Sequence, residues 1–145
     1  MKDGMQVKTL NLEDAQKEIV DEFGIIDEWM DRYSYLIDLG KKLAPLDDKL
    51  KTEEHLIRGC QSRVWVVPEM KDGRIYFFAD SDAMITKGII ALLVRVLSGR
   101  TPAEIINADL HFIDDIGLKE NLSPTRSNGL VNMIRQMKQY ALEHK

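Results

Sequence analysis

Hydrophobic residues near the start of the chain recur three or four positions apart, the spacing that places side chains on one face of an α-helix. These residues are Leu12, Ala15, Ile19 and Phe23. Asn11 lies where an N-cap residue accepts a hydrogen bond from a free backbone N–H, and Gly24 lies where the helix would end. The pattern therefore predicts a first helix between Asn11 and Gly24.

A second stretch with helical spacing follows after a short connection. Its apolar positions, which we expect to form the buried stripe, are Trp29, Met30, Tyr33, Leu36, Ile37 and Leu43. Asp27 precedes them as a candidate N-cap. We expect Pro45 to end this helix, because proline cannot continue the backbone hydrogen bonding.

The pattern then changes to β-branched and aromatic residues, which are typical of strands. Residues 64–69 and 74–79 are predicted strands, and residues 55–58 are a predicted short third strand. Asp72 and Gly73 lie between the two longer strands, and this pair favours a tight hairpin because both positions tolerate positive φ. We therefore expect a small antiparallel three-stranded sheet.

The longest apolar segment follows the predicted sheet. Ser81 is a candidate N-cap for a helix that runs to about Leu97 and is apolar on nearly all sides from residue 85 onward. We expect it to be the central, most buried helix. Gly99 can supply the left-handed turn that ends it.

The remaining helices are marked by their first residues. Thr101 and Glu104 form a capping-box sequence with proline at the first helical position, and residues 110–116 predict a short helix. Ser123 precedes the last helix, whose predicted apolar stripe is Leu130, Ile134, Met137 and Ala141. The order of two helices, a sheet and further helices predicts an α+β fold with the helices packed on one face of the sheet.

Length and charge narrow the class of protein. The 145 residues fit one domain over residues 1–145. A formal net charge of −4 argues against a nucleic-acid partner, because nucleic-acid binders usually carry a basic surface. The longest apolar block, residues 89–94, is too short to span a membrane. A single cysteine and no signal-peptide pattern predict a cytoplasmic location.

Neither a metal nor a cofactor is indicated. The histidines are scattered, and one cysteine cannot assemble a zinc-type or iron–sulfur ligand set. No glycine-rich phosphate loop is present. Asp80 and Asp82 could be read as an acid–base pair, but acidic residues also gather at helix N-termini, where they satisfy free N–H groups. We expect no bound metal and no cofactor.

The single cysteine, Cys60, lies between Gly59 and Gln61 just before a predicted strand. Glycine and small polar residues predict a loop that a partner can reach, and a thiol on such a loop can carry a transferred group. A free cysteine is also often a small buried core residue, and its reactivity depends on its pKa and exposure. The local residues leave both roles open.

Four blocks of residues support a more specific interpretation. In chain order they are Tyr35-Leu36-Ile37-x-Leu39-Gly40, then Gly59-Cys60-Gln61-Ser62 with Val64-Trp65, then Asp80-Ser81-Asp82-Ala83 with Ile85, Lys87-Gly88 and Ile90-Ala91, and finally Leu122-Ser123-Pro124-x-Arg126-Ser127-x-Gly129-Leu130. Together they resemble the SufE-type cysteine desulfuration proteins, which include the CsdE group. The resemblance runs from about Ile26 to the C-terminus, and residues 1–24 form an N-terminal segment outside these blocks.

The resemblance implies a fold of the SufE/IscU type and a function in sulfur transfer. A SufS/CsdA-type cysteine desulfurase, which holds the pyridoxal phosphate (PLP), would pass persulfide sulfur to Cys60. The chain would stimulate that desulfurase and deliver the sulfur to an iron–sulfur scaffold for cluster assembly. The resemblance also implies that the free thiol lies in an apolar pocket. Such a chain would be an accessory sulfur carrier rather than a stand-alone enzyme.

Residues near Cys60 in the matched blocks and its two flanking arginines are candidates for partner binding or loop support. These residues are Arg58, Gly59, Gln61, Ser62, Arg63, Asp80 and Arg126. The two flanking arginines would either favour the thiolate or attract an acidic face of the desulfurase. Arg126 would either stabilise a persulfide or form a structural hydrogen bond. Two alternatives remain: an iron–sulfur scaffold-like protein, which a single cysteine disfavours, and a thiol redox sensor.

Overall fold

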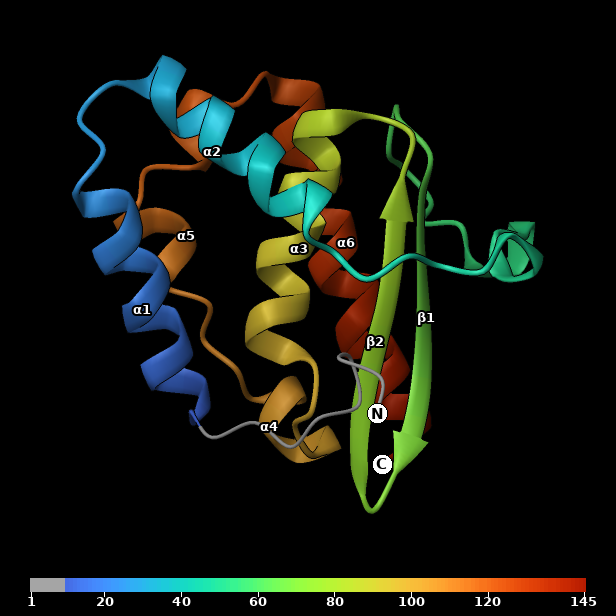
Figure 1. Cartoon of the computed structure of the whole chain (residues 1–145). Helices are drawn as coiled ribbons and strands as arrows, with labels where there is room; N and C mark the ends of the chain where they lie inside the picture. Colours follow the sequence, from blue (N-terminus) through green and yellow to red (C-terminus); the bar gives the residue numbers. More distant parts are fainter. Residues whose placement is uncertain (1–9) are drawn as a thin grey trace.

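The structure is a computed structural model that describes residues 10–145, so the first part of the N-terminal segment, residues 1–9, lies outside the described residues. Helices lie to one side of a two-stranded hairpin (Figure 1). The α-helices are α1 (Leu12–Gly24), α2 (Trp29–Lys41), α3 (Met84–Leu97), α4 (Pro102–Ile106), α5 (Phe112–Asp115) and α6 (Pro124–Glu143). The strands are β1 (Val64–Lys71) and β2 (Arg74–Ser81), and the 3-10 helices are η2 (Asp48–Leu50), η3 (Glu53–His55) and η4 (Lys119–Asn121). The α+β class is confirmed.

The hairpin turn forms as the sequence predicts. Asp72 and Gly73 have φ values of 52° and 76°, the left-handed conformation that a two-residue hairpin turn of this kind requires. The strands pair antiparallel with Lys71 opposite Arg74 and Val66 opposite Ala79. Alternate residues of the two strands, among them Val64, Val66, Ile75, Phe77 and Ala79, are buried against the helices.

The predicted third strand is wrong. Within residues 55–58 the structure places the end of η3 and one isolated bridge, between Leu56 and Trp65. Ile57 adds a backbone hydrogen bond to Val64, but Gly59 has a φ of 82° and turns the chain away. Too few residues separate the 3-10 helix from this turn to build a ladder.

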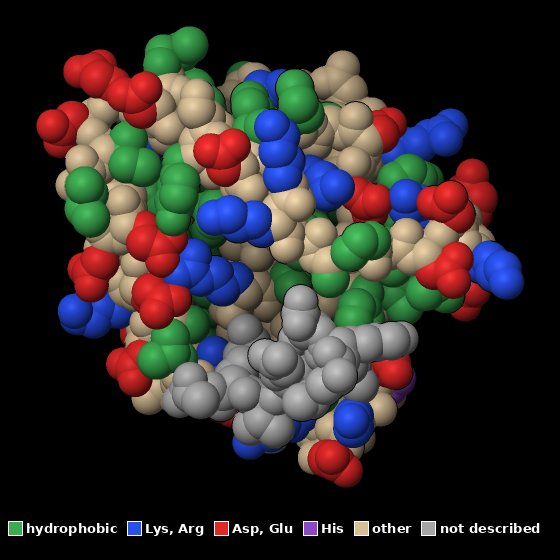
Figure 2. Space-filling view, in the orientation of Figure 1, with side chains coloured by type: hydrophobic (Ala, Val, Ile, Leu, Met, Phe, Trp, Pro, Cys, Tyr) green, Lys and Arg blue, Asp and Glu red, His purple; other side chains and the backbone are tan. Residues whose placement is uncertain are grey.

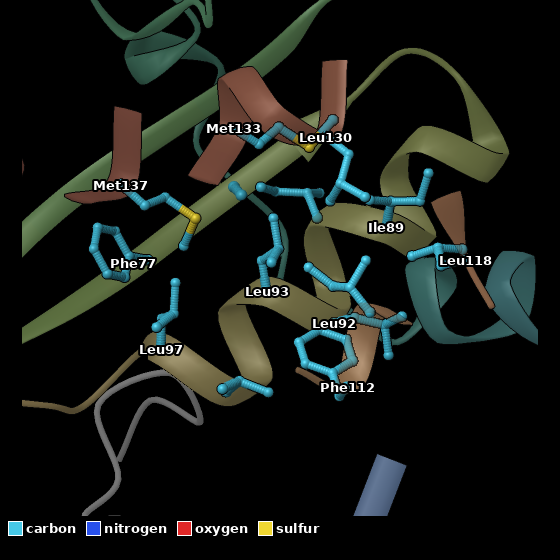
Figure 3. Packing of buried hydrophobic residues seen from close by; sticks show 14 of the residues in the cluster. Phe77, Ile89, Leu92, Leu93, Leu97, Phe112, Leu118, Leu130, Met133 and Met137 are labelled. Carbon is cyan, nitrogen blue, oxygen red and sulfur yellow. The ribbon is translucent and has the colours of Figure 1, made fainter. Parts of the chain in front are cut away.

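The helix α3 lies at the centre of the core, packed against α2, β2, α1 and α6. Figure 3 shows Ile89 and Leu93 of α3 meeting Leu130 of α6 in this layer. On the side of α3 that faces α2, Gly40 and Gly88 let the two helices approach closely. A Cβ at Gly88 would lie 2.1 Å from the carbonyl O of Leu36, so only glycine fits there.

Two helix starts differ from the sequence prediction. α2 begins at Trp29 with Glu28 as its N-cap, not Asp27, and no side chain caps it. Ser81 belongs to β2: its hydroxyl donates a hydrogen bond to the Arg63 carbonyl rather than capping α3. α3 begins three residues later, because the strand pairing extends to Ser81.

The buried stripe of α2 is also narrower than predicted. Met30 is 75% exposed, whereas Leu36 is fully buried against α3. Met30 and Leu36 are six residues apart, which is about one and two-thirds helical turns, so their side chains lie on different faces of the helix. α2 ends at Lys41, well before Pro45, so proline does not set its end.

Two predicted caps are confirmed, and Ser123, which the sequence places before the last helix, also caps it. Asn11 accepts a hydrogen bond from Asp14, Thr101 and Glu104 form the full capping box, and Ser123 accepts from Arg126 at the start of α6. On the face drawn in Figure 2, a group of basic side chains lies near the middle, and acidic and basic side chains are mixed toward the left and right edges. None of the helices in residues 10–145 has the length and apolar character needed to cross a bilayer.

Candidate functional site

Cys60 lies on the loop between η3 and β1, and its side chain is half-buried against α6. Its Sγ lies 3.6 Å from the Gly129 carbonyl O, a long thiol hydrogen bond. A Cβ on Gly129 would lie 3.5 Å from the same sulfur. The absence of a side chain at Gly129 therefore leaves the sulfur facing the helix backbone.

Both ends of the cysteine loop are anchored. Before the cysteine, Asn132 of α6 donates a hydrogen bond from Nδ2 to the Gly59 carbonyl O at 3.0 Å. After it, the Arg63 N–H donates to Oδ1 of Asp82 at 3.0 Å, and the Ser81 hydroxyl donates to the Arg63 carbonyl at 2.8 Å. The residues in between, which include Cys60, are therefore held at both ends, and these contacts oppose opening of the loop.

A cavity of about 230 Å³ opens beside the sulfur. The residues that line it are Cys60, Gln61, Ser62, Thr86, Ile89, Ser123, Thr125, Arg126, Gly129 and Met133. Hydroxyl, amide and guanidinium groups make up much of this wall, and the apolar side chains come from α3 and α6. The apolar pocket that the sequence resemblance implies is therefore a mixed, largely polar cavity here.

Burial raises the pKa of the Cys60 thiol above its ordinary value. A buried thiolate has lost much of its hydration, so the neutral form is favoured in the free protein. The side chains of Arg58 and Arg63 are exposed on either side of the cysteine and are open to solvent. Burial therefore outweighs the flanking cations while the loop is closed, because desolvation is the cause of the shift in the Cys60 pKa.

Four of the residues singled out from the sequence lie together on the cavity wall: Cys60, Gln61, Ser62 and Arg126. Arg58 and Gly59 instead line a second, more open groove of about 360 Å³. The rest of that groove is formed by Ile57 and by Asn132, Arg135, Gln136 and Gln139 of α6. The cysteine loop therefore separates the thiol cavity from a groove that carries two arginines.

Asp80 does not line the Cys60 cavity. Its carboxylate binds Lys51 Nζ at 2.9 Å and Lys87 Nζ at 3.2 Å. Burial raises the pKa of Asp80, but hydrogen bonds from Lys51, the Ser81 N–H and Lys87 outweigh it and hold this pKa below its usual value. The Lys51 ammonium also lies 5.8 Å from the Trp65 ring centroid. Asp80 therefore links β2 to Lys51, which follows η2, and to Lys87 of α3.

Sequence reasoning missed several residues of the cavity wall. Thr86, Ile89, Ser123, Thr125, Gly129 and Met133 line it, although none was singled out as a site residue. Thr86 carried a usable signal, because it is a polar residue on the buried side of an otherwise apolar helix. Among residues 10–145, no group of three or more His, Cys, Asp or Glu side chains is arranged to hold a metal ion.

These observations define a class: an α+β protein with one half-buried thiol on an anchored loop beside a cavity. Residues 17–141 match the family model of the SufE, Fe-S metabolism associated domain. The chain therefore belongs to the SufE family, and the match indicates a role in Fe–S metabolism. A solution structure of a hypothetical protein from Thermus thermophilus shares the fold, with a TM-score of 0.73 at 20% identity over 90% of this chain and 95% of that one.

Curated relatives agree with the family assignment. An uncharacterized SufE-like protein of Rhizobium meliloti is 40% identical over 86% of this chain and 92% of its own length. An uncharacterized SufE-like protein of Synechocystis is 36% identical over 86% of this chain and 79% of its own length. SufE-like protein 1, chloroplastic/mitochondrial, of Arabidopsis thaliana is 43% identical over 87% of this chain but only 34% of its own length. Because that relative is named for organelles, a cytoplasmic location stays a prediction for this chain.

Proposed function

We propose that this protein accepts sulfane sulfur on Cys60 from the persulfide of a PLP-dependent cysteine desulfurase. It stimulates that desulfurase and passes the sulfur on for iron–sulfur cluster assembly. The observation that carries the proposal is the position of the chain's single cysteine, on an anchored loop with its sulfur beside a cavity. The family assignment supports the same role.

The transfer is a thiol exchange in which the Cys60 thiolate attacks the outer sulfur of the donor persulfide. A bond forms between Sγ and that sulfur, the donor S–S bond breaks, and the donor leaves as a thiolate. Because burial raises the pKa of Cys60, the closed loop holds it as the thiol. Movement of the loop on the desulfurase would return the sulfur to solvent, where the thiolate forms more readily.

One cysteine suits a carrier. A second nearby thiol would attack the inner sulfur of the persulfide, form a disulfide and release the cargo as sulfide. Such a thiol is absent from this chain, so a persulfide on Cys60 can be lost only to an external nucleophile. After transfer, closure of the loop would return the loaded sulfur to the cavity.

The proposal is tested by mixing the purified protein with a cysteine desulfurase, PLP and cysteine, and measuring its mass without reductant. We expect one added sulfur, located on Cys60 by peptide mapping, and a faster release of sulfide. Cys60→Ser should remove both effects while it leaves the melting temperature nearly unchanged. Full stimulation by the serine variant would contradict the carrier role. Oxidation of Cys60 by peroxide without any loading would favour a redox sensor.

A further inference from the structure

Thr86 lies on the buried side of α3, with only 5% of its surface exposed, and it lines the cavity beside Cys60. Within residues 10–145 its hydroxyl forms no hydrogen bond. Thr86 is the third residue of α3, so the carbonyl four residues earlier lies before the helix and is not placed to accept from its hydroxyl. The hydroxyl of Thr86 is therefore unpaired among the described residues and reachable from the cavity that it lines.

A polar side chain interrupts an apolar helix face at this place. Polar groups that lose most of their hydration usually find a hydrogen-bond partner, so the Thr86 hydroxyl is available to a group placed in the cavity. The neighbouring positions on the same side of α3, Ile89, Ile90 and Leu93, are apolar and fully buried, so a valine would fit the pattern of this face better. Thr86 instead lines the cavity that it shares with Cys60.

We propose that the Thr86 hydroxyl donates a hydrogen bond to the outer sulfur of the Cys60 persulfide and so positions it inside the cavity. The inference deepens the proposed function and rests on it. A single sulfur needs roughly the volume of one water molecule, about 30 Å³. The cavity, at about 230 Å³, therefore accepts the added atom while the loop stays closed.

The hydrogen bond favours the anionic form of the outer sulfur, which is the form that transfers. This hydrogen bond does not change which bonds form and break in the transfer. The S–S bond between Sγ and the outer sulfur forms as the S–S bond of the donor persulfide breaks. The proton of a neutral persulfide goes to solvent. The other titratable side chain on the cavity wall is Arg126 of α6, and Lys87, next to Thr86 on α3, is engaged by Asp80.

The test loads the protein with inorganic polysulfide, so that no desulfurase takes part. The pH midpoint for alkylation of the Cys60 persulfide and its rate of cyanolysis are then measured. Thr86→Val removes the donor with nearly the same shape, and we expect the midpoint to rise by about one pH unit, a tenfold change in the anion equilibrium. Thr86→Ser keeps the hydroxyl and should retain the wild-type midpoint.

Three controls make the outcome decisive. Melting temperatures verify that each variant is folded, and Thr86→Ala replaces the valine variant if that one does not fold. Arg126→Gln separates the guanidinium from the hydroxyl, so a midpoint that moves only in this variant would overturn the proposal. Equal midpoints for wild type and Thr86→Val would also overturn it. Polysulfide loads the protein without a desulfurase, so the two proposals can fail separately. If the midpoint rises in Thr86→Val but no sulfur is transferred from a desulfurase, only the proposed function is contradicted.

Discussion

Asn132 on α6 donates a hydrogen bond from Nδ2 to the carbonyl O of Gly59 at 3.0 Å, which ties the thiol loop to the last helix. Gly59 has a φ of 82°, and a Cβ there would lie 2.3 Å from the same Nδ2 atom. The absence of a side chain at Gly59 therefore leaves the space that the Asn132 amide occupies. This contact, next to Cys60 in the chain, is the one that we expect to control how readily the loop opens.

Asn132→Ala should expose the thiol more often. Losing one hydrogen bond of about 1 kcal/mol shifts the closed-to-open equilibrium by roughly fivefold, so alkylation of Cys60 at fixed pH should quicken by about that factor. Asn128→Ala, an exposed change on the same helix, serves as the control and should leave the rate unchanged. Equal rates for the two variants would show that this contact does not hold the loop.

Gly88→Ala should destabilise the fold. The added methyl would lie 2.1 Å from the Leu36 carbonyl, so α2 and α3 must separate, at a cost of about 1–3 kcal/mol or more. Gly24→Ala is the matched control, because a Cβ there meets nothing within 4 Å and alanine favours the helix. Urea unfolding of both variants measures the difference, and equal stabilities would contradict the close helix approach.

The sequence predicts those elements of the fold whose signals are local. Asn11, Thr101 and Ser123 cap their helices with their own side chains, and the Asp-Gly pair needs only its own φ values. The third strand and the cap at Ser81 failed for the opposite reason. The cap at Ser81 depends on how far β1 and β2 pair. The third strand depends on how far residues 55–58 can pair with β1 before the chain turns at Gly59.

The candidate site divides in the same way. Cys60, Gln61, Ser62 and Arg126 could be found because they lie in recognisable blocks of sequence. Thr86 carries a weaker signal, as a polar residue on the buried side of an apolar helix, and that signal alone does not place it beside the cysteine loop. Asp80, chosen from such a block, binds two lysines instead.

His111 should make stability depend on pH. It lies 2.7 Å from both the Asp115 and Glu13 carboxylates, and these hydrogen bonds raise its pKa to about 9, from a usual 6.5. A raised folded-state pKa stabilises the fold fully below pH 6.5, and the stabilisation is lost as the pH rises toward 9. The effect should be modest because this side chain is 39% exposed.

The comparison is between wild type and His111→Gln, by urea unfolding at about pH 6 and about pH 9.5, on either side of this range. We expect the variant to be less stable at the lower pH and the two proteins to converge at the higher pH. A difference that stays constant with pH would mean that packing, rather than the charged imidazolium between α1 and α5, accounts for the role of His111.

Arg58→Gln with Arg63→Gln should weaken docking of the desulfurase while the thiol chemistry of the free protein stays the same. Both side chains are exposed, and Arg58 lies on the open groove rather than in the Cys60 cavity. Exposed cations steer an acidic partner, and their effect is screened by salt. We therefore expect several-fold weaker, salt-sensitive binding and an unchanged pH midpoint for Cys60 alkylation. Lys71→Gln with Lys145→Gln makes the same charge change at exposed sites as a control. A clearly raised midpoint with unchanged affinity would instead assign these arginines to thiolate stabilisation.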